Sequence, residues 1–368
     1  MDSITQGLLG ATTAQLGFRQ RIGRDATWVS AGAAIVPDLD IFVMPFLALT
    51  GSEIDGLTPM AIHRGLSHSL LVAPLLSLPI AAAWWWLRRK AQRTRRFPDG
   101  RAERSPPFAL LYACVLVAVA THSLLDWCTS YGTQLLAPLT RTRYAIDAVP
   151  IVDILYTPLL ILTLATCYIV RKLQRDHRAR RVTMVIGWAG FLASVGYLAG
   201  GRAMHNWAVR KAATCAQHQG ARVVQVDAYP ALGTIFLWRT VVETDREWIV
   251  TRIHHFSREP ASTWRTSSIA RDDGPWVAKA MQLGQVETFD WFAGGRLRAE
   301  NSATDGNHIV TFHDMRYGWP VESVESMWPL TVMFDCDGRV AYIGRRNHRP
   351  RGNFSSLVRS VWADIWNP

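Results

Sequence analysis

Residues 108–127 read FALLYACVLVAVATHSLLDW, an apolar run that carries a histidine and an aspartate near its end. About 20 predominantly apolar residues are what an α-helix needs to cross the hydrocarbon core of a bilayer. The stretch therefore predicts a membrane-spanning helix. Its two ionisable residues, His122 and Asp126, lie near one end of that helix rather than at its middle.

Other apolar stretches surround this helix in the first half of the chain. Three approach or exceed the spanning length, one of them interrupted by an aspartate: 69–87, 151–170 and 182–201. Two shorter pieces, 4–18 and 26–49, are rich in Ala and Gly, and these small residues predict a tightly packed helical hairpin. Residues 1–201 are therefore predicted to form a mainly α-helical polytopic membrane domain with about four to six membrane helices.

The basic residues indicate how these helices are oriented. Most of the net charge of +11 lies in the first half, in short links between apolar stretches, above all 88–104 and 171–181. Such links stay on the cytoplasmic side. The pattern predicts a multi-pass protein of the bacterial inner membrane, with the chain after residue 201 in the periplasm. No cleavable signal peptide is expected, because residues 1–18 lack a basic n-region.

A basic chain can also bind nucleic acid. Here no aromatic-basic interleaving and no recognition motif accompanies the charge, so nucleic acid is not expected as a partner. The partners expected are membrane lipids.

The pattern changes after residue 201 to short β-branched and aromatic runs, which are typical of strands. The runs are 222–226, 234–243, 248–256, 308–312, 330–334 and 339–343. Between the last two, Asp337 and Gly338 favour a hairpin turn, and a helix is predicted over 276–292. Residues 202–368 are therefore predicted to form a soluble, β-rich α+β domain.

Ionisable residues gather beside or within the apolar stretches, where unpaired charge is costly. They are Asp38 and Asp40, His63 and His68, His122 and Asp126, and Asp153. Residues four apart face the same side of a helix, so His122 and Asp126 have the geometry of two ligands of one metal ion. His63 and His68 converge only if the chain turns at Gly65.

Simpler explanations exist for each pair. The aspartates after Pro37 suit helix N-caps, the histidines before the 69–87 stretch suit a solvated loop, and the pair on the 108–127 helix suits a hydrogen bond that tethers helices. Asp153 suits a cap or a partner for Arg141 or Arg143. A shared metal site is favoured because the predicted topology places the whole set at the outer face. Thiol sites are not expected, since the five cysteines show no CxxC spacing.

Five segments of the sequence resemble a known family. They are MDSITQGLLGA from Met1, PDLD from Pro37, HRGLSHSLL from His63, THSLLDWCTSYGTQLL from Thr121 and VDILYTPLL from Val152. Together they span roughly the first 170 residues and resemble the bacterial inner-membrane metal-dependent hydrolases related to the YdjM-type proteins. The pattern is more distantly similar to zinc-dependent phospholipase C. Many relatives have His where this chain has Gln6. This departure argues against a ligand role for position 6.

The resemblance implies a metal-dependent hydrolase with six candidate metal ligands: Asp38, Asp40, His63, His68, His122 and Asp126. Asp38, His68 and Asp126 are the candidate catalytic residues. Asp153 is a candidate accessory group for substrate, and Arg64 is a candidate clamp for an anionic substrate such as a lipid phosphate. Mixed nitrogen and oxygen ligands favour Zn²⁺, with Mn²⁺ or Fe²⁺ as alternatives.

The leading hypothesis from the sequence is a hydrolase that acts on a phosphoester or lipid-like ester at the outer membrane face, through a metal-activated water. The alternative is a non-catalytic membrane protein with a structural metal site and a partner-binding outer domain. A closed four-ligand shell would favour that alternative. Transport is disfavoured, because the polar groups lie at one face rather than at the bilayer midplane.

Overall fold

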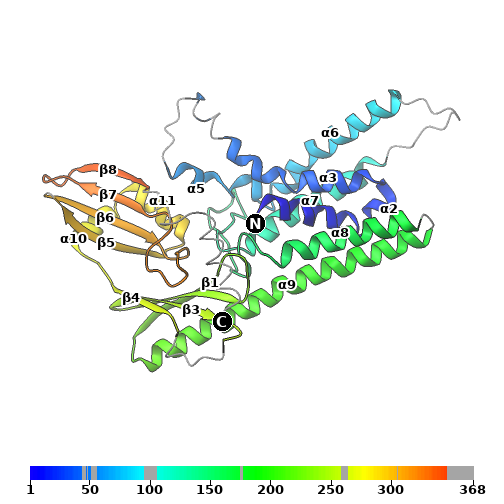
Figure 1. Ribbon diagram of the computed structural model, residues 1–368. Helices are drawn as coiled ribbons and strands as arrows, with labels where there is room; N and C mark the ends of the chain where they lie inside the picture. Colours follow the sequence, from blue (N-terminus) through cyan, green and yellow to red (C-terminus); the bar gives the residue numbers. More distant parts are fainter. Residues whose placement is uncertain are drawn as a thin grey trace. The chain divides into compact units, whose positions relative to one another are not determined.

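The computed structural model describes residues 1–43, 47, 49–50, 56–94, 106–174, 177–257, 264–304 and 306–345 of the 368-residue chain (Figure 1). The chain divides into two compact units. The first comprises Met1–Val43, Ile62–Ile146 and Ile151–Ala199, and the second comprises Met44–Ala61, Asp147–Pro150 and Gly200–Pro368. The first unit is helical and the second is built mainly of strands.

Helices of very different lengths make up the first unit. In chain order they are α1 (Ser3–Ala14), α2 (Phe18–Ile22), α3 (Asp25–Ala33), the 3-10 helix η1 (Val36–Phe42), the 3-10 helix η2 (Leu66–His68), α6 (Ala73–Thr94), α7 (Phe108–Trp127), α8 (Tyr156–Leu173) and the first part of α9 (His177–His218). The short α5 (Thr58–Ile62) precedes η2.

Among the described residues, three helices are long and apolar enough to cross a membrane: Phe108–Trp127, Tyr156–Leu173 and Arg178–His218. The bent pair Thr58–His68 and Ala73–Lys90 adds a fourth if it crosses as one span. Three spans fall below the expected range of about four to six, and four would reach its lower edge. The reason is that α1 and α3 have 12 and 9 residues, too few to cross the hydrocarbon core.

α1 and α3 instead form the packed helical pair that their small residues predict. A Cβ atom on Gly10 would lie 2.4 Å from the carbonyl oxygen of Ser30, so only glycine permits this approach. Asp2 caps α1 by accepting a hydrogen bond of 3.0 Å from the Thr5 backbone N–H. The capped end of α1 lies beside η1, where the Ser3 hydroxyl donates to Asp38 at 2.6 Å.

α9 extends beyond both ends of the predicted 182–201 stretch and forms a single helix of 42 residues. Residues 202–218 contain neither Gly nor Pro, so nothing in their local sequence stops the helix. The first helix breaker is Gly220, which has a φ of 76° just after the helix ends. The change to a more polar composition at residue 202 therefore marks no helix end.

The second unit contains two antiparallel four-stranded sheets, each in simple sequential order. The strands are β1 (Val223–Pro230), β2 (Leu237–Thr244), β3 (Glu247–His254) and β4 (Thr266–Ala270), then β5 (Leu297–Thr304), β6 (Asn307–Asp314), β7 (Leu330–Phe334) and β8 (Val340–Arg345). Two short helices, α10 (Pro275–Ala280) and α11 (Gly284–Ala293), separate the sheets in sequence. Fully buried apolar side chains include Trp238, Ile253, Phe289, Phe312 and Phe334.

The six predicted strands are confirmed, as is the hairpin between β7 and β8. Gly338 has the expected positive φ, 76°, and the Asp335 N–H donates to the Arg339 carbonyl at 2.9 Å. β4 and β5 were not predicted, because their sequences TSSIA and LRAENSAT lack the apolar alternation of a half-buried strand. The predicted helix over 276–292 is two helices, with the break just before Gly284.

Within the first unit, α8 and α9 pack closely at one glycine. A Cβ atom on Gly190 of α9 would lie 2.2 Å from the hydroxyl oxygen of Thr163 on α8 and 2.8 Å from its Cβ. At Gly196, six positions further along the same helix, an added Cβ atom would meet no heavy atom of the described residues within 4 Å.

We expect Gly190→Ala to lower the thermal unfolding temperature of the detergent-solubilised protein, because overpacking costs about 1–3 kcal/mol. Gly196→Ala is the matched control: it brings the same gain in helix propensity without the clash. Equal unfolding temperatures for the two variants would contradict the close α8–α9 contact.

Candidate metal centre

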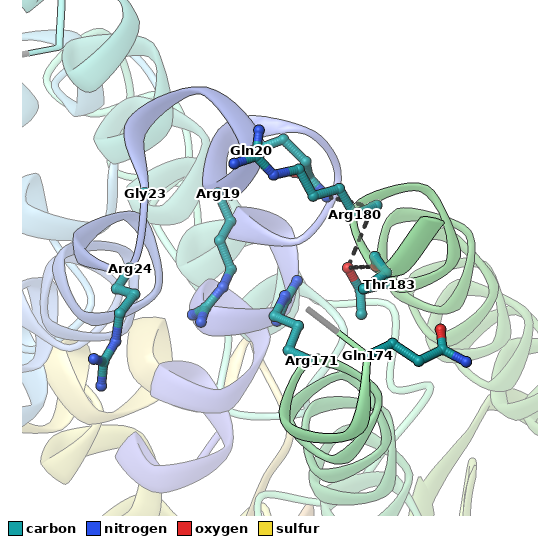
Figure 2. Close-up of a pocket in the computed structure, with 9 residues that line it drawn as sticks. Arg19, Gln20, Gly23, Arg24, Arg171, Gln174, Arg180 and Thr183 are labelled. Carbon is teal, nitrogen blue, oxygen red and sulfur yellow. Dashed lines mark hydrogen bonds between the residues drawn. The ribbon is translucent and has the colours of Figure 1, made fainter. Parts of the chain in front are cut away.

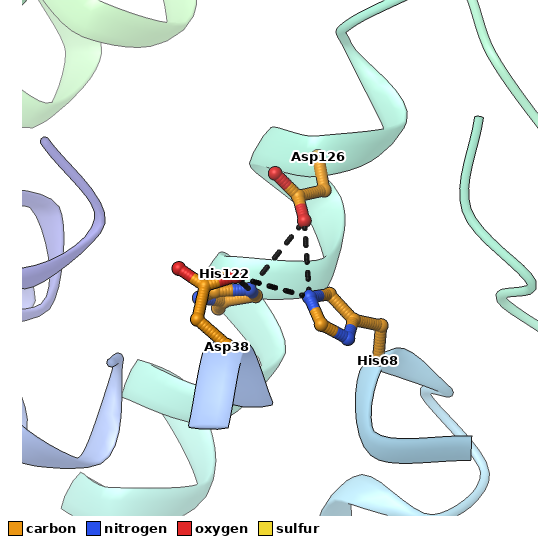
Figure 3. A group of neighbouring side chains, drawn as sticks. All are labelled: Asp38, His68, His122 and Asp126. Carbon is orange, nitrogen blue, oxygen red and sulfur yellow. Dashed lines mark ion pairs between the residues drawn. The ribbon is translucent and has the colours of Figure 1, made fainter. Parts of the chain in front are cut away.

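Three separate segments of the first unit bring four titratable side chains to one point. Asp38 comes from η1, His68 from η2, and His122 and Asp126 from the last turns of α7. One ligand-type atom of each residue lies within 4.8 Å of those of the other three. Figure 3 shows the four side chains converging from the three segments. We call these four residues the primary cluster.

The distances within the primary cluster are nearly uniform. The Nε2 atom of His68 lies 3.4 Å from Asp38 Oδ1 and 3.3 Å from Asp126 Oδ2. The Nε2 atom of His122 lies 3.4 Å from each of the same two oxygens. The predicted i, i+4 pairing of His122 with Asp126 is thus present on α7.

These atoms are close but make no hydrogen bonds of normal geometry. Nε2 of His68, Nε2 of His122 and Oδ2 of Asp126 are buried and have no hydrogen-bond partner among the described residues. A tetrahedral zinc shell with ligand distances of about 2.0–2.1 Å places its donor atoms roughly 3.3–3.4 Å apart. The four measured separations match that spacing, so the donor set fits a divalent ion.

The second nitrogen of each imidazole is held by another group. His122 Nδ1 donates to the Ala34 carbonyl oxygen at 2.5 Å, which leaves Nε2 without a proton in the neutral ring and free to bind metal. His68 Nδ1 lies 2.9 Å from the Ser67 hydroxyl and 3.5 Å from Asp40 Oδ2. Such outer contacts orient metal-binding histidines in known sites.

A second group shares His68 with the primary cluster and consists of Asp40, His63 and His68. His63 Nδ1 lies 2.8 Å from Asp40 Oδ1, and Ser67 donates to Asp40 Oδ2 at 2.7 Å. The rings of His63 and His68 make an edge contact with their centroids 5.4 Å apart. The chain turns between them as expected, with Gly65 preceding η2.

The six predicted ligands therefore divide into two groups that meet at His68. Its Nε2 faces the primary cluster and its Nδ1 faces Asp40. The ligand roles of all six residues stay predictions.

Positive groups surround Asp126, which is fully buried. The Arg64 side chain is only 4% exposed, and its Nε lies 3.1 Å from Asp126 Oδ2. Its Nη1 donates to the Thr129 hydroxyl at 2.7 Å. The Met1 amino group contacts Asp126 Oδ1, and the Gln6 amide donates to the same oxygen at 3.0 Å.

The aspartates of η1 stay ionised for a clear physical reason. Burial raises the pKa of Asp38, but the His122 and His68 imidazoles and the Ser3 hydroxyl lower it more, so the net shift is well below the usual range. Burial likewise raises the pKa of Asp40, and contacts with His63, His68 and Ser67 outweigh that effect. Both carboxylates are available as oxygen ligands at neutral pH.

Asp153 lies in neither group. Its Oδ1 accepts hydrogen bonds of 2.8 Å from the backbone N–H groups of Leu155 and Tyr156, and the Tyr197 hydroxyl of α9 lies 2.9 Å from both carboxylate oxygens. Asp153 thus holds the N–H groups at the start of α8 and links that helix to α9. A substrate role for Asp153 stays a prediction.

Some contributors to the site carry little signal in the sequence. Ser67 bridges Asp40 and His68 and could have been found from its place between the two histidines. Gln6 stood out only because it departs from the family pattern. The Ala34 carbonyl could not have been found, since every residue has one and its direction is set by the end of α3.

A helical unit with candidate membrane spans and a buried His/Asp cluster able to hold a divalent ion defines a membrane protein with a candidate metal site. The family model described as YdjM inner membrane protein matches residues 1–207. The chain belongs to this family, as its sequence segments suggest. A search of the curated proteins and a search of the solved structures found no match.

The metal content of variants tests whether the ion is bound by the primary cluster or by the group of Asp40, His63 and His68. We expect the purified protein to hold about one divalent ion per chain. His122→Ala removes a primary ligand and should abolish binding, whereas His63→Ala should keep the ion, because His63 is not in the primary cluster. The measurement is elemental analysis of variants with normal yield and thermal stability, with the exposed His218→Ala as control. Loss of metal in His63→Ala but not in His122→Ala would overturn the assignment.

Proposed function

We propose that this protein is a metal-dependent hydrolase that acts on a phosphoester or lipid-like ester at the outer face of the inner membrane. The observation that carries the proposal is the primary cluster, whose facing atoms have metal-ligand spacing and include three buried atoms, His68 Nε2, His122 Nε2 and Asp126 Oδ2, with no hydrogen-bond partner among the described residues. A divalent ion bound there would supply an activated water at neutral pH and would stabilise negative charge that develops on the substrate. Zn²⁺ suits the two histidines and two carboxylates best, and Mn²⁺ or Fe²⁺ are alternatives.

The exposure of the four side chains indicates that substrate would reach the primary cluster from the side of η1. His68, His122 and Asp126 have fully buried side chains, whereas the side chain of Asp38 is 15% exposed. Substrate would therefore approach over Asp38, whose second oxygen is held by Ser3. His63 is 24% exposed, and its Nδ1 lies 2.8 Å from Asp40 Oδ1. In this proposal the His63–Asp40 pair moves a proton to or from the reacting group.

Two arginines near the metal centre, Arg64 and Arg143, have different roles in this proposal. Arg64 is buried against Asp126, so we assign it the orientation of that carboxylate, and its role as an anion clamp stays a prediction. Arg143 is half-buried and donates to the Gly132 carbonyl at 2.8 Å, and its guanidinium lies 5.2 Å from the centre of the Tyr131 ring. The Arg64 guanidinium lies on the same ring at 4.7 Å. Arg143 also donates to the His63 carbonyl at 3.4 Å, so it brings positive charge beside the second group, which suits an anionic ester.

A structural metal site is the second candidate, and one observation favours it. Two histidines and two aspartates can fill a tetrahedral shell completely, the pattern of structural rather than catalytic zinc. The catalytic proposal requires that Asp38, the exposed member, leave room for substrate. An activity measurement on metal-loaded protein separates the candidates.

We expect the zinc-loaded protein to hydrolyse bis(p-nitrophenyl) phosphate, p-nitrophenyl phosphate or phosphatidylglycerol in mixed micelles. His68→Ala should abolish turnover, and Asp40→Asn should lower kcat roughly 10- to 100-fold through the lost support of His68. His218→Ala should match the parent. Stoichiometric metal without release of product from any of the three substrates would reject the hydrolase and favour the structural site.

The location of the site at the outer face follows from the basic links, which should be cytoplasmic. An alkaline phosphatase reporter fused after Pro368 should therefore be active, and one fused after Gln174, between α8 and α9, should be inactive. Fluorescence of a cytoplasm-only reporter at the Pro368 position would reverse the orientation on which this location depends.

A further inference from the structure

A cavity of about 360 Å³ lies in the first unit, away from the metal ligands. α2 and the residues just after it form one side, and the end of α8 with the first turns of α9 forms the other (Figure 2). Its lining is unusually basic and comprises Arg19, Gln20, Gly23, Arg24, Arg171, Gln174, Ala179, Arg180 and Thr183. No predicted site residue belongs to it.

Four arginines of this cavity have no acidic partner within the described part of the chain. No carboxylate there lies within ion-pair distance of Arg19, Arg24, Arg171 or Arg180, whereas nearby Arg88 is paired with Asp25. Burial, and then the charge of Arg24, lower the pKa of Arg19. Like charges crowded into a partly buried space attract an anion strongly.

Neutral groups hold the two inner arginines in place. Arg19 Nη1 donates to the Thr27 hydroxyl at 2.6 Å, and Arg171 Nη2 donates to Gln15 Oε1 at 2.7 Å. The Gln15 amide in turn donates to Thr27 at 3.1 Å. Figure 2 shows Arg19 and Arg171 reaching toward each other from opposite sides. The guanidinium groups are thus oriented without being neutralised, as in a preformed anion site.

The surroundings of the cavity indicate what kind of anion it meets. It lies at the turn between α8 and α9, two candidate membrane spans, in a link that the positive-inside rule places at the cytoplasmic surface. The adjoining end of α8 exposes large apolar side chains, namely Tyr168, Ile169 and Leu173. Phosphate groups and acyl chains of one lipid would meet these two surfaces together.

We propose that this cavity binds the phosphate group of an anionic phospholipid of the inner leaflet. Bidentate guanidinium contacts suit a phosphodiester, and basic pockets between membrane helices on the cytoplasmic side are a recurrent form of headgroup site. The site is independent of the metal centre, because the two share no residue. Its role is to fix the α2 corner and the α8–α9 turn at the inner surface.

The test is isothermal titration calorimetry of the full-length protein in neutral detergent. The three titrants are dioctanoyl phosphatidylglycerol, dioctanoyl phosphatidylcholine and inorganic phosphate. We expect saturable binding of phosphatidylglycerol and weaker binding of the zwitterionic lipid. Arg19→Gln with Arg171→Gln should weaken phosphatidylglycerol binding on the order of tenfold or more, because charge-assisted hydrogen bonds are lost. Arg21→Gln with Arg178→Gln removes the same charge from exposed positions outside the cavity and should change affinity less than about twofold.

Each other outcome rejects part or all of the proposal. Unchanged affinity in the Arg19/Arg171 variant rejects the site. Equal binding of both lipids rejects anion recognition, and inorganic phosphate that binds as tightly as phosphatidylglycerol makes the ligand a free anion rather than a lipid. If the Arg19/Arg171 variant does not fold, Arg24→Gln with Arg180→Gln serves in its place, since both side chains are exposed and should weaken binding without loss of fold.

Discussion

Burial of His122 and Asp126 at one end of an apolar helix is the constraint around which the helical unit is arranged. Both side chains are fully buried, and a buried carboxylate without partners costs several kcal/mol. The neighbouring segments supply those partners. The Met1 amino group and the Gln6 amide contact Oδ1 of Asp126, and Arg64 and His68 face its Oδ2. α7 can be this apolar and still carry the pair only because the pieces around it converge there.

Convergence requires irregular backbone in the segments that deliver these partners. η1 and η2 are 3-10 rather than α-helical, and Arg64 has a φ of 61°, a left-handed conformation that costs a non-glycine residue about 1–3 kcal/mol. A Cβ atom on Gly65 would lie 2.8 Å from the Ile62 carbonyl oxygen. Contacts of Arg64 with Asp126 and Thr129 thus hold the turn that separates His63 from His68. The geometry of the group formed by Asp40, His63 and His68 therefore depends on the ion pair between Arg64 and Asp126 of the primary cluster.

The sequence was informative where a pattern repeats along the chain and less so where position depends on tertiary contacts. The length of the 108–127 run, the i, i+4 spacing of His122 and Asp126, and the Asp-Gly turn at residue 338 are local, so they could be predicted. The division of the six ligands at His68 could not, because it depends on which ring nitrogen faces which carboxylate. The hydrogen bonds from the Leu155 and Tyr156 N–H groups to Asp153 are local and were among the explanations that the sequence offered, whereas the contact of Asp153 with Tyr197, distant in sequence, could not be predicted.

The dimensions of the helices bear on the kind of ester that the metal centre would meet. His122 follows the start of α7 by 14 residues, or roughly 21 Å of helix, whereas the hydrocarbon core is about 30 Å thick. If α7 begins at the inner boundary, as its basic preceding link implies, His122 lies roughly 9 Å below the outer boundary, within the outer half of the hydrocarbon core. The length of α1 indicates the same depth. At one end of α1, Ser3 contacts Asp38 of the primary cluster, and just after the other end Gln15 contacts Arg171 of the basic cavity. The 12 residues of α1 span roughly 18 Å of helix. A recessed centre is reached more readily by the ester linkages of a lipid than by a soluble phosphoester, so the short first helices, which do not span, favour a lipid as the substrate of the proposed hydrolase.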